Sequence, residues 1–242
     1  MKERKISTGS YDLNKWLYGG YERDIITTIY GPAGSGKTNF CLIVAASQAK
    51  KGNKVLFIDT EGGFSIDRIK QLVGENYKEI LKNIILLKPT SFSEQKNCIL
   101  KLQKEIKNKG KINLIIVDGM TMLYRLELAE VKEQIEKVRE INRELARQMK
   151  ILAEIARTKN IPVIITNQVY HEFLSKEEFE AGKKAGTRMV GGDLLKYWSK
   201  CLIELKVENG KRKAILRKHR SLREKELNFI ITNKGIKKRG WI

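Results

Sequence analysis

The sequence of 242 residues predicts one α/β domain with a mainly parallel central sheet, helices on both faces and antiparallel strands at its C-terminal end. Three observations support this prediction. Short apolar runs alternate with longer stretches of helical periodicity, which is the pattern of βαβ units. A glycine-rich segment joins the first of these runs to a helix-compatible stretch. In the last third, apolar runs follow one another across turn-forming residues, as they do in antiparallel hairpins.

The apolar runs of the first two thirds are expected to form buried parallel strands, because they are short and carry few charges. These runs are residues 25–30, 55–59, 84–87, 114–118 and 163–166. Helices are expected between them, over residues 37–51, 93–108 and 128–159. The antiparallel strands of the last third are expected at residues 201–207, 213–218 and 227–232.

Charge is unevenly distributed along the chain. The formal net charge is +20, and residues 206–240 hold thirteen lysines and arginines against three glutamates, which is half of that net charge. An evenly biased composition would spread its cations over the whole sequence. The concentration therefore favours contact with DNA, whether single-stranded, double-stranded or branched, and a merely solvated basic face is the alternative.

Other features of the composition exclude several classes of protein. No apolar stretch approaches the roughly 18 residues that a membrane helix needs. The first residues lack the apolar run of a signal peptide, so we expect a cytoplasmic, nucleoid-associated protein. The three cysteines are far apart and show no CxxC spacing, which supports neither a disulfide framework nor a zinc site.

The most specific motif is the segment Gly-Pro-Ala-Gly-Ser-Gly-Lys-Thr at residues 31–38, a complete GxxxxGK[ST] pattern between a predicted strand and a predicted helix. In such a P-loop the backbone N–H groups surround phosphates, the lysine reaches the β- and γ-phosphates, and the threonine hydroxyl ligates magnesium. We therefore predict ATP and Mg²⁺ as cofactors. The nucleotide-binding residues are Gly31, Pro32, Ala33, Gly34, Ser35, Gly36, Lys37, Thr38 and Asn39.

Polar residues follow three further predicted strands. Asp118 ends residues 114–118 and is expected to hold the magnesium ion through water. Glu61 follows residues 55–59, where it would either orient the attacking water or cap the next helix. Gln168 follows residues 163–166 and would either sense the γ-phosphate or form part of a turn.

Together these motifs resemble the RecA/RadA recombinase superfamily, in particular the archaeal RadA paralogues that consist of the ATPase core alone. The resemblance runs from Ser7-Thr8-Gly9-Ser10 to the glycine pair Gly191-Gly192. It implies a RecA-type P-loop NTPase fold, with one ATPase core over residues 1–242 and no N-terminal helical DNA-binding domain. It also implies that Glu61, Lys37 and Gln168 form the catalytic set, that Arg68 stacks on adenine, and that Gln168 couples the nucleotide to DNA binding.

The resemblance also indicates where DNA would bind. The first DNA-binding loop of the family would begin near Arg125, and it looks short and acidic here. The second would span about residues 170–190, where Tyr170, His171 and Phe173 either stack on bases or pack within the loop. Together with the basic last third, it supplies the predicted phosphate contacts, which are Arg125, Lys183, Lys184, Arg188, Lys211, Arg212 and Lys213.

The function that the resemblance implies is DNA binding with weak ATPase activity and an accessory role in recombination. We expect no strand exchange, because the family's polymerisation linker and the prolines of its ATP cap have no counterpart in the sequence. The expected protein partner is a RadA-type recombinase or a Holliday-junction resolvase, and the chain could also pair with a second copy of itself. Two alternatives are a KaiC-like regulatory ATPase that acts on protein partners and an adaptor that binds nucleotide without hydrolysing it.

Overall fold

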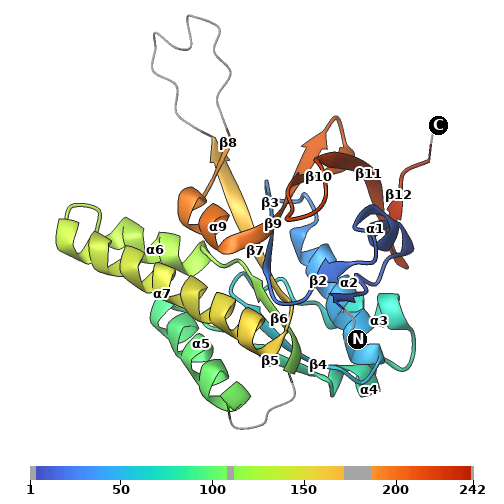
Figure 1. Ribbon diagram of the computed structural model, residues 1–242, viewed down its shortest axis with the longest axis horizontal. Coiled ribbons are helices and arrows are strands. Elements are labelled where there is room, and N and C mark those ends of the chain that lie inside the picture. Colours follow the sequence, from blue (N-terminus) through green and yellow to red (C-terminus); the bar gives the residue numbers. More distant parts are fainter. Residues whose placement is uncertain (1–3, 108–111, 172–186, 241–242) are drawn as a thin grey trace, which may run out of the picture.

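The computed structural model describes residues 4–107, 112–171 and 187–240 (Figure 1). A ten-stranded sheet runs through the molecule in the order β12-β11-β10-β9-β3-β7-β6-β4-β5, and β8 pairs with β7 beside this path. A separate two-stranded sheet joins β1 (Lys5–Ile6) to β2 (Tyr21–Glu22). The predicted α/β class is therefore confirmed.

The centre of the large sheet is parallel, as predicted. Its strands are β3 (Ile26–Gly31), β4 (Lys54–Asp59), β5 (Ile84–Leu87), β6 (Ile112–Asp118) and β7 (Val163–His171). All five run in the same direction, in the order β3-β7-β6-β4-β5. Their carboxyl ends consequently meet at one edge, which is where parallel α/β sheets bind ligands.

The antiparallel part of the sheet comes from the last third, as predicted. Strand β9 (Ser199–Glu208) pairs in parallel with β3 and antiparallel with β10 (Lys211–Lys218). Two further antiparallel strands follow, β11 (Lys225–Thr232) and β12 (Gly235–Lys238). The short strand β8 (Thr187–Met189) is antiparallel to the end of β7.

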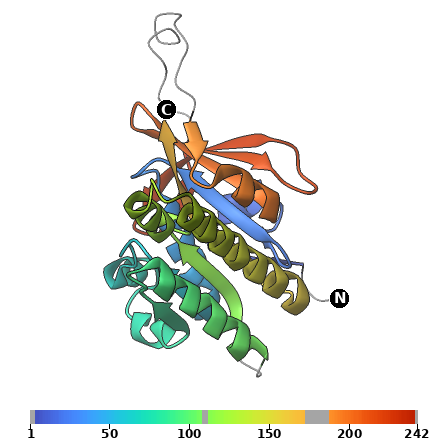
Figure 2. The same cartoon turned by 90° about the vertical axis from the view of Figure 1, so that its left-hand side faces the viewer.

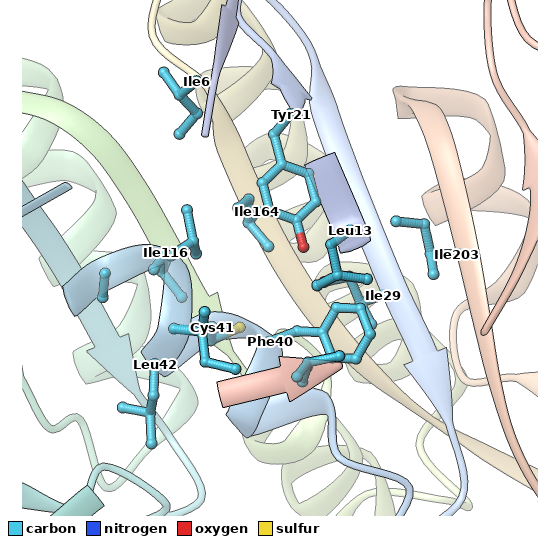
Figure 3. Packing of buried hydrophobic residues seen from close by; sticks show 14 of the residues in the cluster. Ile6, Leu13, Tyr21, Ile29, Phe40, Cys41, Leu42, Ile116, Ile164 and Ile203 are labelled. Carbon is cyan, nitrogen blue, oxygen red and sulfur yellow. The ribbon is translucent and has the colours of Figure 1, made fainter. Parts of the chain in front are cut away.

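Helices cover both faces of the central strands, because neighbouring side chains on each strand point to opposite faces. On one face lie α1 (Tyr11–Trp16), α2 (Lys37–Lys50), α3 (Ile66–Val73) and α4 (Tyr77–Leu81). Phe40 of α2 and Leu13 of α1 pack there against Ile29 of β3 (Figure 3). This face carries the helix that begins at the P-loop.

The other face is covered by the second group of helices, which lies in front of the sheet in Figure 2. These helices are α5 (Phe92–Lys107), α6 (Met122–Glu130), α7 (Ile135–Lys159) and α9 (Gly192–Trp198). Strand β6 shows the alternation directly, since Ile116 joins the first core and Ile115 the second. None of the helices in the described part of the chain is long and apolar enough to cross a membrane.

The helix predicted over residues 128–159 is wrong at its beginning. Helix α6 ends at Glu130, a turn follows, and α7 begins at Ile135. The turn is closed by hydrogen bonds from Val131 N to Leu128 O and from Gln134 N to Val131 O. Leu128, Val131 and Ile141 all pack against the same core. The apolar spacing therefore continues across the turn, although the backbone helix does not.

Helix α6 occupies the position where the first DNA-binding loop was expected to begin. Arg125, predicted to lie near the beginning of that loop, is an exposed residue within α6. The only irregular backbone between α6 and α7 is the short turn at residues 131–134. A rigid helix, rather than a loop, thus presents Arg125 to solvent.

Candidate functional site

The P-loop joins β3 to α2 at the carboxyl edge of the parallel strands. Gly34 and Gly36 adopt positive φ angles of 71° and 107°, a conformation that glycine accepts without steric cost. Lys37 is 7% exposed, and its Nζ donates to the carbonyl oxygens of Gly31 and Pro32 at 2.9 Å each. Burial lowers the pKa of Lys37, and the carboxylates of Glu61 and Asp118 partly oppose that change. These two carbonyl oxygens therefore hold the Lys37 ammonium against the P-loop.

Asp118 lies at the end of β6, directly beside Asp59 at the end of β4. Its Oδ1 accepts a hydrogen bond from the Thr166 hydroxyl at 2.6 Å. Its Oδ2 is buried and has no hydrogen-bond partner within the described residues. Burial raises the pKa of Asp118, and the hydroxyls of Thr166 and Thr38 partly oppose the rise. A buried carboxylate with one unused oxygen, close to a threonine hydroxyl, suits a water-linked magnesium ion.

Other groups at this edge also fit a nucleotide and its metal. The Ser35 hydroxyl in the P-loop is buried and unpaired within the described residues. In the same part of the chain no three acidic, histidine or cysteine side chains form a metal cluster. Magnesium at Thr38 and Asp118 would therefore need phosphate oxygens and water as its remaining ligands, as is usual for Mg²⁺ in phosphate sites.

The hydrogen bonds of the turn between β4 and α3 bear on the two roles considered for Glu61, which are orienting the attacking water and capping the next helix. Asp59 accepts the backbone N–H groups of Gly63 and Phe64 at 3.0 and 2.9 Å. Ser65 is the N-cap of α3 and accepts from Arg68 N. Ser65 thus provides the helix cap that was the alternative role for Glu61, and Asp59 closes the turn before that helix. The exposed Glu61 carboxylate is left facing the edge of the sheet.

Gln168 provides the hydrogen-bond partner of Glu61. Its Nε2 lies 3.1 Å from both carboxylate oxygens of Glu61. The alternative that Gln168 forms a turn is wrong, because β7 continues to His171. Asn167, the preceding residue, is buried and donates to Val190 O at 2.7 Å. Strand β7 thus runs from the nucleotide-binding edge of the sheet to its antiparallel pairing with β8.

Arg68 occupies a fixed position beside α2. Its guanidinium donates to Asn39 Oδ1 at 2.9 Å, to Gln71 Oε1 at 2.8 Å and to the carbonyl oxygen of Thr232 at 2.8 Å. Three acceptors in different directions hold the plane of the guanidinium. A planar cation held in this way can stack on an aromatic base. Asn39, a predicted nucleotide-binding residue, thus also holds Arg68 in place.

The structure does not bring Lys211, Arg212 and Lys213 onto one surface, because side chains alternate along β10. Arg212 turns toward the P-loop, and its NH2 lies 3.3 Å from Gly34 O. Lys213 pairs with Glu226 at 3.0 Å. Lys211 is exposed and borders a groove beside α1. Arg212 is thus positioned for the nucleotide site.

The remaining predicted DNA contacts are only partly described. Lys183 and Lys184 lie outside the described residues, as does Phe173. The backbone of Arg188 belongs to β8, but its side chain, like that of His171, is outside them as well. Arg125 and Tyr170 border one cavity of about 550 Å³. The cavity lies between α6 and two described residues of the second predicted segment, Tyr170 and Val190.

Two contributions to this site were missed from the sequence. Thr166 bonds to Asp118, and Arg212 reaches the P-loop from a strand 178 residues further along the chain. Thr166 ends a predicted strand, so its position at the edge was foreseeable, but its neighbour was not. No signal in the sequence distinguishes Arg212 from the lysines on either side of it.

The chain is similar in sequence and in structure to known recombination proteins. The Rad51 family profile matches residues 2–239. The DNA repair and recombination protein RadB of Methanobrevibacter smithii is 41% identical over 96% of this chain and 95% of the relative. The protein of the same name from Methanocaldococcus jannaschii is 44% identical over 93% and 98%. A crystal structure of the RadB recombinase has a TM-score of 0.76 and 33% identity, covering 97% of this chain and 100% of that one.

Proposed function

Because the chain belongs to the RadB group of the Rad51 family, we propose that it binds Mg²⁺-ATP and DNA and assists homologous recombination without exchanging strands. Its fold is that of the RecA-type P-loop NTPases, as the resemblance implied. Residues 1–242 would form one ATPase core that acts in the cytoplasm at the nucleoid. The names of its relatives support a role in DNA repair and recombination.

One observation carries the proposal that nucleotide and DNA binding are linked, namely the contact between Gln168 and Glu61. Glu61 is the residue that would orient the attacking water. Gln168 lies on β7, whose far end pairs with β8 on the other side of residues 172–186. A change at the γ-phosphate that releases Gln168 from Glu61 would therefore act on the strand pair that leads to the second DNA-binding segment.

Each side chain at the sheet edge has a role in nucleotide binding. The backbone amides of the P-loop and the Lys37 ammonium would bind the phosphates, for which Lys37 must leave its two carbonyl acceptors. Arg68 would stack on the base, held by Asn39 and Thr232. Bound magnesium would neutralise charge on the phosphates. Thr38 and Asp118 would hold that ion, with Asp118 acting through water.

Hydrolysis would depend on Glu61 and would be slow. The carboxylate would orient a water molecule and accept its proton as the water attacks the γ-phosphate. In this structure both carboxylate oxygens accept from Gln168, which competes with water for them. We therefore expect water to reach the Glu61 carboxylate more readily when Gln168 moves away. This competition is a physical reason to expect weak ATPase activity.

The same contact also favours a second candidate function, an adaptor that binds ATP without hydrolysing it. In that case Glu61 would stay engaged with Gln168 after ATP has bound. DNA affinity would then depend on nucleotide occupancy and not on hydrolysis. A RadA-type recombinase or a Holliday-junction resolvase remains the proposed protein partner for either function.

The test is DNA binding by the whole chain, measured by fluorescence anisotropy over a range of salt concentrations with ATP, with ADP and without nucleotide. We expect log affinity to fall linearly with log salt, and DNA affinity to differ between ATP and ADP. Binding that is indifferent to nucleotide would refute the link through Gln168. Absence of DNA binding in all three states would refute the proposed function itself.

A further inference from the structure

A groove of about 850 Å³ lies between α1 and the C-terminal strands β11 and β12. These elements lie side by side at the right of Figure 1, although more than 200 residues separate α1 from β12 in sequence. The volume is in the range of clefts that hold small ligands, about 300 to 1,000 Å³. Nothing in the nucleotide site described above uses this groove.

Two exposed tyrosines border the groove. Tyr11, the first residue of α1, is 79% exposed, and Tyr18, just after that helix, is 70% exposed. Lys225 Nζ lies 4.0 Å from the ring centroid of Tyr18, so it covers one face of that ring. Tyr18 also has a φ of 51°, which is unfavourable for a residue with a bulky side chain. Two large aromatic rings are thus held in solvent, where they gain little from burial.

The groove is basic because five lysines and arginines line it against two acids, Asp12 and Glu226. Asp12 accepts the backbone N–H of Lys238 at 2.8 Å, and Glu226 pairs with Lys213 at 3.0 Å. Five cations on the groove have no carboxylate partner within the described residues, and they are Lys15, Lys211, Lys225, Lys238 and Arg239. Trp16, a buried wall residue, has an indole Nε1 without an acceptor in the same part of the chain.

The walls of the groove are fixed to each other. The Ser10 hydroxyl, at the N-cap of α1, donates to Ile236 O of β12 at 2.6 Å. The bond between Asp12 and Lys238 N ties the same two elements two residues further along each of them. Leu13 and Ile236 also belong to one hydrophobic core. The tyrosines and the cations are therefore held on a rigid frame, which lowers the entropy cost of binding.

We propose that this groove binds a segment of single-stranded DNA, an inference that rests on the DNA-binding function proposed above. Exposed aromatic rings stack on unpaired bases, and cations along the same groove contact the phosphates. In a duplex the faces of the bases are already stacked, so a duplex can use only the cations. The combination of rings and unpaired cations selects the single strand. The groove is formed by residues other than the predicted DNA-binding segments near Arg125 and at residues 170–190.

The first test compares variants of the whole chain by anisotropy with a fluorescein-labelled oligothymidylate and with its duplex with oligoadenylate. Tyr11→Ala should weaken single-strand binding by about tenfold, whereas Tyr11→Phe should retain most of it, since stacking needs the ring and not the hydroxyl. Duplex affinity should stay within about twofold in both variants. Because Tyr11 is largely exposed, its replacement should leave the thermal unfolding midpoint unchanged.

The second test concerns charge. Lys238→Ala should reduce the slope of log affinity against log salt for the single strand by about 0.7. Lys101→Ala is the matched control, because Lys101 is an exposed cation on α5, a helix that contributes nothing to the groove. It should leave the slope unchanged. An equal reduction of the salt slope in Lys238→Ala and Lys101→Ala would mean that DNA binding depends on net charge alone. That result would overturn the proposal that the groove binds DNA.

A third measurement locates the DNA without any variant. An oligonucleotide containing 5-iodouracil, irradiated on the wild-type chain, should crosslink to peptides that contain Tyr11 or Tyr18. Crosslinks confined to other peptides would overturn the proposal. So would an equal effect of Tyr11→Ala on single strand and duplex, which would indicate a general polyanion surface. Failure of the wild-type chain to bind either DNA would refute the proposed function and the groove together, whereas unaffected binding by Tyr11→Ala refutes only the groove.

Discussion

The side-chain amide of Gln168 lies 3.1 Å from both carboxylate oxygens of Glu61, across 107 residues of sequence. Glu61 follows β4 and Gln168 lies on β7, and these strands are not neighbours, because β6 lies between them. Their side chains therefore meet over the end of β6, where Asp118 is located. The contact places the proposed catalytic carboxylate and the proposed nucleotide sensor in a single hydrogen-bonded unit.

The first prediction concerns catalysis by Glu61. Glu61→Gln keeps the size of the side chain but removes its charge and its ability to accept a proton. ATP binding should persist, while phosphate release should fall by about tenfold or more. Glu79→Gln, at an exposed position on α4, should hydrolyse ATP at the wild-type rate. Equal turnover in Glu61→Gln and the wild type would exclude Glu61 as the catalytic base.

The second prediction concerns the coupling residue. Gln168→Ala should abolish any difference in DNA affinity between the ATP and ADP states, because the link between Glu61 and β7 is lost. Binding driven by charge should remain, with the same salt dependence as the wild type. Anisotropy titrations in the two nucleotide states measure both quantities. A variant that still distinguishes ATP from ADP would show that coupling follows another route.

The third prediction concerns Lys37. Lys37→Ala should abolish detectable ATP binding, because the backbone amides of the P-loop alone would face an under-neutralised triphosphate. The measurement is a titration with a fluorescent ATP analogue, supported by the shift in unfolding temperature with ATP. Lys50→Ala, at the other end of the same helix, is the control and should bind ATP normally. Unchanged affinity in Lys37→Ala would contradict the site.

The fourth prediction concerns Asp118 and pH. Burial raises the pKa of this carboxyl in the folded chain. Between the unfolded and folded pKa values the folded chain holds more protons, so its free energy of unfolding falls as pH rises through that interval. Asp118→Asn should therefore raise the Tm of the nucleotide-free chain at neutral pH and reduce the additional stabilisation by Mg²⁺ with ATP. Asp193→Asn, a fully exposed control, should change neither. A lower Tm in Asp118→Asn would contradict the view that the buried charge of Asp118 destabilises the nucleotide-free chain.

The fifth prediction separates neighbouring cations on β10. Arg212→Ala should weaken ATP binding and leave the salt dependence of DNA binding unchanged, because its guanidinium faces Gly34 of the P-loop. Lys211→Ala should do the reverse and flatten the salt slope for DNA by about 0.7 to 0.9. Lys213→Ala, whose ammonium already pairs with Glu226, should have little effect on either. If all three substitutions changed ATP affinity and the salt slope equally, Lys211, Arg212 and Lys213 would have to be regarded as one DNA-binding surface.

Local chemistry accounts for what could be predicted from the sequence. The P-loop is recognisable because its glycines, lysine and threonine are needed at a fixed spacing by the phosphates themselves. The central strands are recognisable because strands buried on both faces must be apolar throughout. Residues 25–30 and 114–118 were therefore predicted nearly as the structure has them, whereas the strand predicted at 163–166 continues to His171. Their polar ends were expected at one edge because parallel strands share a direction.

Periodicity was less informative about where helices break. The spacing of Leu128, Val131 and Ile141 reports which side of the chain faces the core, and that side is the same on α6 and α7. The turn between them leaves no mark in the apolar pattern. Similarly, the carboxylates of Asp59 and Glu61 follow the same strand, and only the structure shows that Asp59 accepts the backbone N–H groups of the turn.

The sequence by itself determined the α/β class, the nucleotide-binding loop and the concentration of positive charge in the last third. The tertiary structure decided which of those groups meet. Gln168 contacts Glu61 because the strand order places β7 two positions from β4. Arg212 reaches the P-loop while Lys211 borders a groove with Tyr11, because adjacent side chains on a strand point in opposite directions. Charge and motif are local properties of the chain, whereas contact across a sheet depends on strand order and register, which no local pattern encodes.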